Sequence, residues 1–158
     1  MLSKPSGSSR SPVAHAHLAA WRAFLEAHAR VTEVLGRELR EQEGLPLAWY
    51  DVLVQLSEAD DHRRRMQELA DAVLLSKSGL TRLIDRMERE GLVTRVECPT
   101  DRRGTLAELT PAGYERLAAT APTHLDGVRR HFTDLLADEE AEILGRALSR
   151  IAEQARRR

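Results

Sequence analysis

The stretch Ser76-Lys-Ser-Gly-Leu-Thr-Arg-Leu-Ile-Asp-Arg-Met-Glu-Arg-Glu-Gly91 decides the fold, because it contains every signal of one amphipathic helix. Ser76 is a favourable N-cap, and Gly91 is a favourable residue at which to stop. Between them, apolar side chains recur at a spacing of three and four residues, at Leu80, Leu83, Ile84 and Met87. The pattern predicts a helix over residues 76–90 with one face in a core.

The segments on either side of this helix complete a winged helix-turn-helix pattern. Residues 66–73 form a second, short amphipathic helix pattern, and only Leu74 and Leu75 separate it from Ser76, as in a helix-turn-helix. After Gly91, two extended segments, 92–97 and 105–109, enclose Cys98-Pro-Thr-Asp-Arg-Arg-Gly104. We therefore expect a two-stranded hairpin with a seven-residue loop.

Longer helical patterns flank this central part, over residues 16–42, 110–132 and 139–156. A short helix is expected after Pro46, followed by a polar, turn-like run from 57 to 65. Because proline lacks an N–H group, we expect the helix over 110–132 to bend or restart near Pro122. The expected fold class is mainly α, a winged helix-turn-helix with N- and C-terminal dimerisation helices and a two-stranded β wing.

The expected domain organisation follows from these patterns. Residues 1–14, rich in Ser, Pro and Gly, are expected to be a disordered arm, 46–110 a winged helix-turn-helix lobe, and 15–45 with 111–158 dimerisation helices. Apolar stripes at the two chain ends need burial, and include Leu18, Trp21, Leu25, Ile143, Leu144, Leu148 and Ile151. They can pack together in a monomer or against a second copy, and the pattern alone leaves both open.

Composition excludes several classes of protein. The 158 residues are enough to bury a core, and the single cysteine, Cys98, excludes an intrachain disulfide and a Cys-rich zinc site, so we expect a reducing cytoplasm. The N-terminal stretch has no apolar run of the kind found in signal peptides or membrane spans, so no membrane association is expected. Nothing resembles a catalytic triad, a phosphate loop or a paired-carboxylate site, so we expect no enzymatic activity, catalytic residue or cofactor.

Charge and hydroxyl groups point to DNA as the partner. The net charge is −1, but residues 62–103 hold ten Lys and Arg against seven Asp and Glu. Arginine can donate two hydrogen bonds to guanine in the major groove, hydroxyls contact bases or phosphates, and a lysine in a first helical turn suits a phosphate. The expected DNA-binding residues of helix 76–90 are Lys77, Ser78, Thr81, Arg82 and Arg86. Taken alone, such a face is also compatible with an ordinary solvated helix surface.

The predicted hairpin tip adds a second group of candidates. Arginines at such a tip are suited to the negative potential of a narrow minor groove, so Arg102 and Arg103 are expected DNA contacts. Asp101 is expected to orient Arg102 through a charge-assisted hydrogen bond.

Together these motifs resemble the MarR family. The resemblance is carried, in order and spacing, by Met66-Gln-Glu-Leu-Ala-Asp71, the stretch from Ser76 to Arg95, Asp101-Arg-Arg103 and Leu109-Thr-Pro-Ala-Gly113. It implies a triangular homodimer with interlocked terminal helices, helix 76–90 in the major groove and Arg102 in the minor groove. It also implies a sequence-specific, ligand-responsive repressor whose partners are double-stranded DNA, at a pseudo-palindromic operator, and a second copy of the chain.

The resemblance further implies a small aromatic or anionic effector, bound between the dimerisation helices and the DNA-binding lobe. The candidate ligand-binding residues are Trp21, His28, Trp49, Asp51 and Arg86. Core packing or solvent-exposed charge is the alternative explanation for each of them.

The residues alone are also compatible with other functions. The fold also suits a small-molecule, metal or haem-sensing carrier without operator recognition, or a protein-interaction module, because fold does not fix function. His15, His17 and His28 invite a metal or haem site, but no carboxylate or cysteine lies at a recognisable ligand spacing, and no metal is expected. Arg95 and Arg102 would favour a Cys98 thiolate and hence redox sensing, although an inert loop side chain is the simpler expectation.

Overall fold

The computed structural model describes residues 15–99 and 101–157, without the side chains of Arg102 and Arg103, and it confirms the mainly α winged helix-turn-helix fold. The arm predicted over 1–14 lies outside the described residues. The elements are, in order, α1 (His15–Glu43), α2 (Leu47–Ser57), η1 (Asp60–His62), β1 (Arg63–Arg65), α3 (Met66–Ala72), α4 (Lys77–Arg89), β2 (Val93–Cys98), β3 (Asp101–Leu109), α5 (Pro111–His131), η2 (Thr133–Leu135) and α6 (Asp138–Arg156).

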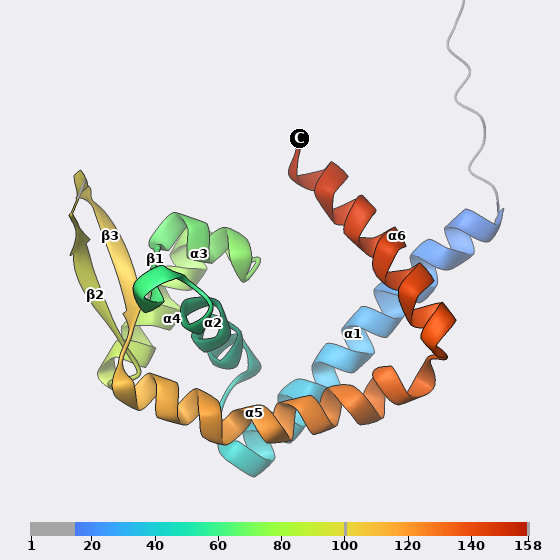
Figure 1. Cartoon of the computed structure of the whole chain (residues 1–158), viewed down its shortest axis with the longest axis horizontal. Coiled ribbons are helices and arrows are strands. Elements are labelled where there is room, and N and C mark those ends of the chain that lie inside the picture. Colours follow the sequence, from blue (N-terminus) through green and yellow to red (C-terminus); the bar gives the residue numbers. More distant parts are fainter. Residues whose placement is uncertain (1–14, 100, 158) are drawn as a thin grey trace, which may run out of the picture.

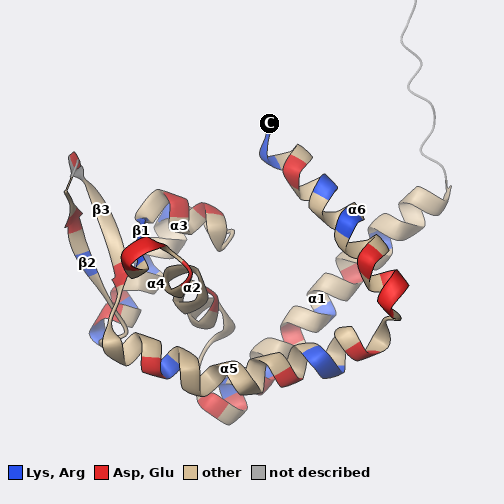
Figure 2. Ribbon diagram, viewed as in Figure 1, with Lys and Arg blue, Asp and Glu red and all other residues tan. Residues whose placement is uncertain are grey.

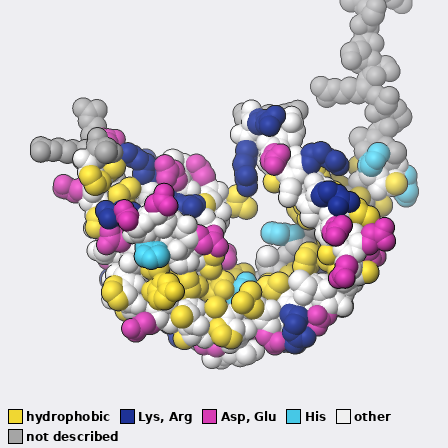
Figure 3. Space-filling model, in the orientation of Figure 1, with side chains coloured by type: hydrophobic (Ala, Val, Ile, Leu, Met, Phe, Trp, Pro, Cys, Tyr) yellow, Lys and Arg dark blue, Asp and Glu magenta, His cyan; other side chains and the backbone are white. Residues whose placement is uncertain are grey.

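Two parts of the molecule stand on either side of the crossing of α1 and α5 (Figure 1). One part runs from α2 to β3 and is called here the winged lobe. The other consists of α6 and residues 15–30 of α1, called here the outer helices. Figure 3 shows a hollow between the two parts, lined in places by hydrophobic side chains.

The winged lobe closes over a core of aliphatic side chains. Its fully buried members come from α2, α3, α4 and β2, and include Val52, Leu53, Leu56, Leu69, Leu80, Ile84, Met87 and Val93. Leu39 near the end of α1 and Leu117 of α5 join the same cluster. Each large aliphatic side chain that leaves water in this way contributes about 1.5–3 kcal/mol, so this core holds α4 rigidly on the lobe.

The helix α4 forms as its local signals predict. The Ser76 hydroxyl accepts a hydrogen bond from the Gly79 amide at 3.1 Å, which caps the helix start. Gly91 has a φ of 72°, the left-handed conformation in which glycine ends helices at little cost. Leu80, Leu83, Ile84 and Met87 are all buried, which confirms the predicted apolar face.

The wing differs in two respects from the expected hairpin. β1, Arg63–Arg65, pairs antiparallel with β3 and adds a third strand in the order β1-β3-β2, where a polar turn was expected. The strands β2 and β3 also continue to Cys98 and Asp101, so the predicted seven-residue loop is wrong. Pairing between strands satisfies backbone N–H and C=O groups that would otherwise be left to solvent, which explains why residues of turn-like types form strands here. The register of the β2–β3 pair shifts once, at an irregularity between Glu97 and Cys98.

Helix α5 continues through Pro122 as one helix, so of the expected bend or restart the restart is wrong, and the bend stays a prediction. Contacts with α1 hold it beyond the proline, because the Thr123 hydroxyl donates to a Glu43 carboxylate oxygen and Gly127 is buried against Leu35. Pro122 itself is exposed, so its ring does not disturb this contact.

Charged residues at both ends stabilise helix α6, and its apolar face is not covered by the rest of the described chain. Acidic residues occupy its first turn and Arg156 its last, which complements the helix dipole (Figure 2). The Ala137 amide donates to a Glu140 carboxylate oxygen at 2.9 Å, which caps the start. No residue from Asp138 to Arg156 is buried, and Ile151 remains 61% exposed.

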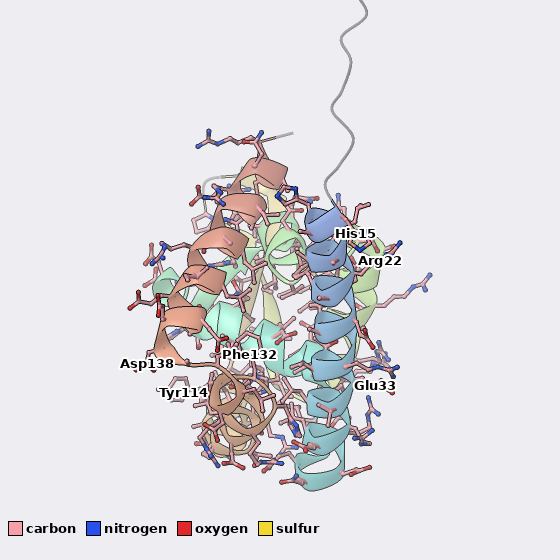
Figure 4. All side chains as sticks on the ribbon, turned by 90° about the vertical axis from the view of Figure 1, so that its right-hand side faces the viewer. His15, Arg22, Glu33, Tyr114, Phe132 and Asp138 are labelled. Atoms are coloured by element: carbon pink, nitrogen blue, oxygen red, sulfur yellow. The ribbon has the colours of Figure 1, made fainter. Side chains whose placement is uncertain are left out.

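The first half of α1 is equally uncovered. Trp21 is 55% exposed, and Leu18, Phe24 and Leu25 are also exposed. Figure 4 shows α1 and α6 as two separate columns. The apolar stripes of the chain ends therefore do not bury each other within one chain.

Among residues 15–99 and 101–157, no helix has both the length and the apolar composition that crossing a bilayer requires.

Candidate nucleic-acid interface

The structure gathers the predicted DNA-binding residues of α4 on one solvent-exposed surface. Lys77, Ser78, Thr81 and Arg82 line a shallow, open recess together with the cap residue Ser76. The Thr81 hydroxyl donates to the Lys77 carbonyl oxygen at 2.9 Å, which leaves its oxygen able to accept. Arg86 lies one turn further on and donates weakly to the Arg82 carbonyl oxygen, at 3.4 Å.

This surface is cationic because its bases make no ion pairs, whereas its two acids share one compensating arginine. Lys77, Arg82 and Arg86 make no ion pair with any carboxylate in the described part of the chain. The two acids of α4, Asp85 and Glu88, each pair with Arg95 of β2. An approaching polyanion would therefore meet unpaired positive charge on α4.

Arg95 is a functional candidate that sequence reasoning missed in this role. Its Nη2 lies 2.5 Å from Asp85 Oδ1, its Nη1 lies 2.6 Å from Glu88 Oε2, and its main-chain N–H donates to Glu88 Oε1 at 2.9 Å. Burial alone would lower the pKa of Arg95, but the hydrogen bonds with the two carboxylates outweigh burial and raise that pKa. Because Arg95 is on a strand, both carboxylates are on a helix and a turn separates the two elements, no single period relates the three residues, and no sequence signal marks the cluster.

A second arginine, Arg65 of β1, fixes the far end of the wing. Its Nη2 donates to Cys98 Sγ at 3.2 Å, and its Nη1 lies 3.7 Å from Asp101 Oδ2. Sequence reasoning placed Arg65 in a turn and so missed this contact. The side chains of Arg102 and Arg103 lie outside the described residues, so the support of Arg102 by Asp101 stays a prediction.

Cys98 is a buried residue at the end of β2, so its expected placement in a loop is wrong. It is 6% exposed, and the Arg65 guanidinium contacts its sulfur. A thiol so enclosed has little access to an oxidant.

The structure distributes the predicted effector residues over both parts of the molecule. Trp21 and His28 are exposed on α1, Trp49 packs partly against the lobe core, and Arg86 is on α4. Asp51 lines a recess of about 230 Å³ between α2 and the turn after α3, which includes none of the other four residues. Asp51 is an exposed residue, but partial burial of its carboxyl group raises the pKa of that group. Their shared role as a ligand site stays a prediction.

Histidines do not converge in this structure. His15 and His17 lie in the first turn of α1, and His124 stacks on Tyr50 with a centroid distance of 4.3 Å. Within the described ranges, no three His, Cys, Asp or Glu side chains are placed to hold a metal ion.

Comparison with known proteins gives a consistent result. The model of the MarR family matches residues 43–104. The structure is similar to that of AbsC, a MarR family transcriptional regulator from Streptomyces coelicolor, with 42% identity, a TM-score of 0.85, and coverage of 94% of this chain and 100% of AbsC. Sco3205 of the same organism, a MarR family transcriptional regulator solved in complex with DNA, has 37% identity and a TM-score of 0.84, over 91% of this chain and 94% of its own. The HTH-type transcriptional regulator YkoM of Bacillus subtilis is 30% identical over 78% of this chain and 79% of its own length.

Proposed function

Because the chain belongs to the MarR family of transcriptional regulators, we propose that it binds double-stranded DNA sequence-specifically and regulates transcription, rather than catalysing a reaction. The observation that carries the proposal is the exposed face of α4, on which cations are unpaired while both acids are paired with Arg95. The relative Sco3205, solved in complex with DNA, supports the same conclusion. DNA as the target implies action in the cytoplasm.

In this proposal α4 lies in the major groove. Its 13 residues span about 20 Å, and a helix fits the width of that groove. Arg82 reads a guanine, and Ser78 and Thr81 contact bases or phosphates. Lys77 neutralises a phosphate, and Arg86 contacts the DNA beside it.

The wing contributes a second contact, in the minor groove. Arg102 enters where the groove is narrow, Arg103 contacts the backbone beside it, and Asp101 orients Arg102. The position of this tip at the end of the β2–β3 hairpin, away from the lobe core, supports the assignment (Figure 1).

We propose that the functional unit is a homodimer. Residues 46–110 form the DNA-binding lobe, and 15–45 with 111–158 form the dimerisation helices. The exposed apolar stripes of the outer helices, which stay uncovered within one chain, support this division. A two-fold axis places two α4 helices about 34 Å apart, which requires a pseudo-palindromic operator.

Regulation is proposed to work as repression relieved by a small aromatic or anionic effector. Such a ligand, held by residues among Trp21, His28, Trp49, Asp51 and Arg86, would stabilise a dimer with wrongly spaced α4 helices. The partly buried carboxyl group of Asp51, beside a recess in the lobe, supports a polar contribution from that residue.

The test is selection of binding sites by the purified full chain from a random-sequence duplex library, followed by affinity measurements at several salt concentrations. We expect an enriched inverted repeat and an affinity that falls linearly with salt on a log-log plot. Arg82→Ala should cost about 1–3 kcal/mol on the selected duplex and relax preference at one base pair of each half-site. Lys77→Ala should instead weaken binding to all duplexes alike and reduce the salt slope by about 1.

Two results would contradict the proposal. If no sequence is enriched even in dilute buffer, DNA recognition is wrong. If Arg82→Ala lowers affinity equally on every sequence, Arg82 does not read a base. Binding of a protein partner that does not weaken with salt would point instead to a protein-interaction module.

A further inference from the structure

Arg95 spans two turns of α4 from outside that helix. Its guanidinium reaches the carboxylates of Asp85 and Glu88 at 2.5 and 2.6 Å, and its Nη2 also lies 3.4 Å from the Thr81 carbonyl oxygen. A single side chain of β2 thus contacts α4 at residues 81, 85 and 88. We call Arg95, Asp85 and Glu88 the α4–β2 clasp.

We propose that Arg95 is a positioning residue for DNA binding, which fixes the wing against α4 and whose positive charge offsets one of the two negative charges of Asp85 and Glu88 that would otherwise repel DNA. This inference rests on the proposed function. It adds a role for a residue that does not itself touch DNA.

The electrostatic part follows from where the acids lie. Asp85 is three residues from Arg82, so it lies on the same exposed face of α4, and its side chain is 48% exposed. Glu88 follows one turn later and is 37% exposed. Both are at the edge of the surface that meets phosphates, where an uncompensated carboxylate weakens binding through like-charge repulsion.

The geometric part follows from strand register. Arg95 pairs with Ala107 in the middle of the β2–β3 ladder, so its attachment to α4 sets the direction in which the hairpin leaves the lobe. Arg65 ties Cys98 and Asp101 together nearer the tip of the same hairpin. A hairpin held at these two places presents its tip at a fixed position relative to α4.

At position 95, an arginine can hold both carboxylates of the clasp, whereas a lysine cannot. A guanidinium is planar and donates in a fixed fork, so it bridges two carboxylates and orients both. The pairing is also enclosed, because the Arg95 side chain is only 26% exposed. A lysine ammonium supplies the charge but not the two directed contacts.

The experiment is a double-mutant cycle in the full chain. The variants are Arg95→Ala, Asp85→Asn with Glu88→Gln, and the triple variant. The probes are the duplex selected in the experiment above and a shuffled duplex of equal length, with affinity read by fluorescence anisotropy and folding by thermal unfolding. Arg63→Ala is the matched control, because Arg63 lies 3.7 Å from each of two carboxylates, Asp61 and Glu108, at the opposite edge of the same sheet.

We expect Arg95→Ala to lower affinity for the selected duplex about tenfold, a change of about 1.4 kcal/mol. In the Asp85→Asn, Glu88→Gln background the same substitution should cost about threefold or less, because no carboxylate is left to neutralise. Arg63→Ala should stay within about twofold of the unmodified protein, since its partners are not on α4.

Arg95→Lys guards against loss of folding. If Arg95→Ala unfolds, the cycle is repeated with lysine, and we expect a loss of about threefold that disappears in the neutral background. A role in folding alone would shift thermal unfolding without this dependence on background.

The outcomes separate this inference from the proposed function. If the unmodified protein does not distinguish the two duplexes, the proposed function fails. If it does, and Arg95→Ala binds normally or loses equally in both backgrounds, the positioning role is wrong.

Discussion

The winged lobe and the outer helices carry the same kind of apolar stripe, but only the lobe buries its stripe within the chain. Leu53 and Ile84 of the lobe are 0% exposed, whereas Trp21 and Ile151 of the outer helices are more than half exposed. The lobe encloses its stripes because helices and a sheet converge from several directions, whereas α6 and the first half of α1 stand apart (Figure 4).

The difference teaches that hydrophobic periodicity predicts which face needs burial but not what buries it. In the lobe the partner is the same chain. For the outer helices, the proposed partner is a second copy, and each prediction below tests one side of this contrast.

The largest effect is expected from Ile151→Asp. A carboxylate on the apolar face of α6 costs several kcal/mol when an interface closes over it, and a two-fold dimer contains the substitution twice. We expect dimers to become monomers, as measured by sedimentation velocity. Ser149→Asp adds the same charge about 200° around the helix and should leave the dimer intact. A dimer that survives Ile151→Asp would remove α6 from the interface.

A smaller effect is expected from Leu53→Ala in the closed core. The cavity should lower the free energy of unfolding by about 2–5 kcal/mol, measured by urea denaturation. Leu74→Ala makes the same change at a residue that is 88% exposed and should have little effect. Equal losses at the two positions would contradict the described core.

Thr120→Val tests a buried polar atom at the junction of the two parts. Thr120 is 0% exposed, and its hydroxyl oxygen has no hydrogen-bond partner among the described residues. Since valine keeps the shape and removes an unsatisfied hydroxyl, we expect a gain of up to about 1 kcal/mol in thermal unfolding experiments. Thr105→Val, at an exposed position of β3, is the control. A clear loss of stability at position 120 would show that the hydroxyl is satisfied.

The smallest effect is expected from Glu38→Gln, where α1 meets the end of α5. A hydrogen bond from His131 at 2.8 Å, aided by Arg130, lowers the pKa of Glu38 below its ordinary value of 4.5. The ionised carboxylate therefore stabilises the fold above that ordinary value, and its contribution is lost as the pH falls through the lowered pKa.

The variant should be less stable by no more than about 1 kcal/mol at neutral pH, because solvent screens the cluster, and equal to the unmodified protein in acid. Thermal unfolding as a function of pH measures this. Glu33→Gln, at an exposed pair with Arg30, is the control and should change the stability little. A difference that persists in acid would contradict the ionic explanation.

Local sequence signals were sufficient to predict the helices of the winged lobe. Ser76, Gly91 and the spacing of the apolar residues between them predict α4 to within a residue, because capping and periodicity act over a few residues. The exposed face of α4 followed directly, since residues opposite a buried stripe must face solvent.

Contacts between distant residues were not predictable in this way. Arg63–Arg65 become a strand only because β3 lies beside them, more than 40 residues later, and nothing in three arginines indicates a strand. The length of the hairpin loop was overestimated for the same reason, since Cys98 pairs with Asp101 although the residues between them are of turn-forming types. The clasp around Arg95 likewise depends on how β2 lies across α4.

The start of α5 is held against the winged lobe by a pair of hydrogen bonds and a direct backbone contact. The Thr110 hydroxyl accepts from the Gly113 amide and donates to the Gly91 carbonyl oxygen, so the first turn of α5 is tied to the end of α4. A β-carbon at Gly113 would overlap the main-chain oxygen of Leu92, so the two backbones are in direct contact.

From this point α5 extends for 21 residues, about 31 Å, toward α6. A helix of this length acts as a lever, and a tilt of a few degrees at its base displaces its far end by roughly 2 Å. In the proposed dimer, a methyl group at position 113 would thus change the distance between the two lobes without altering any of the proposed DNA-binding residues.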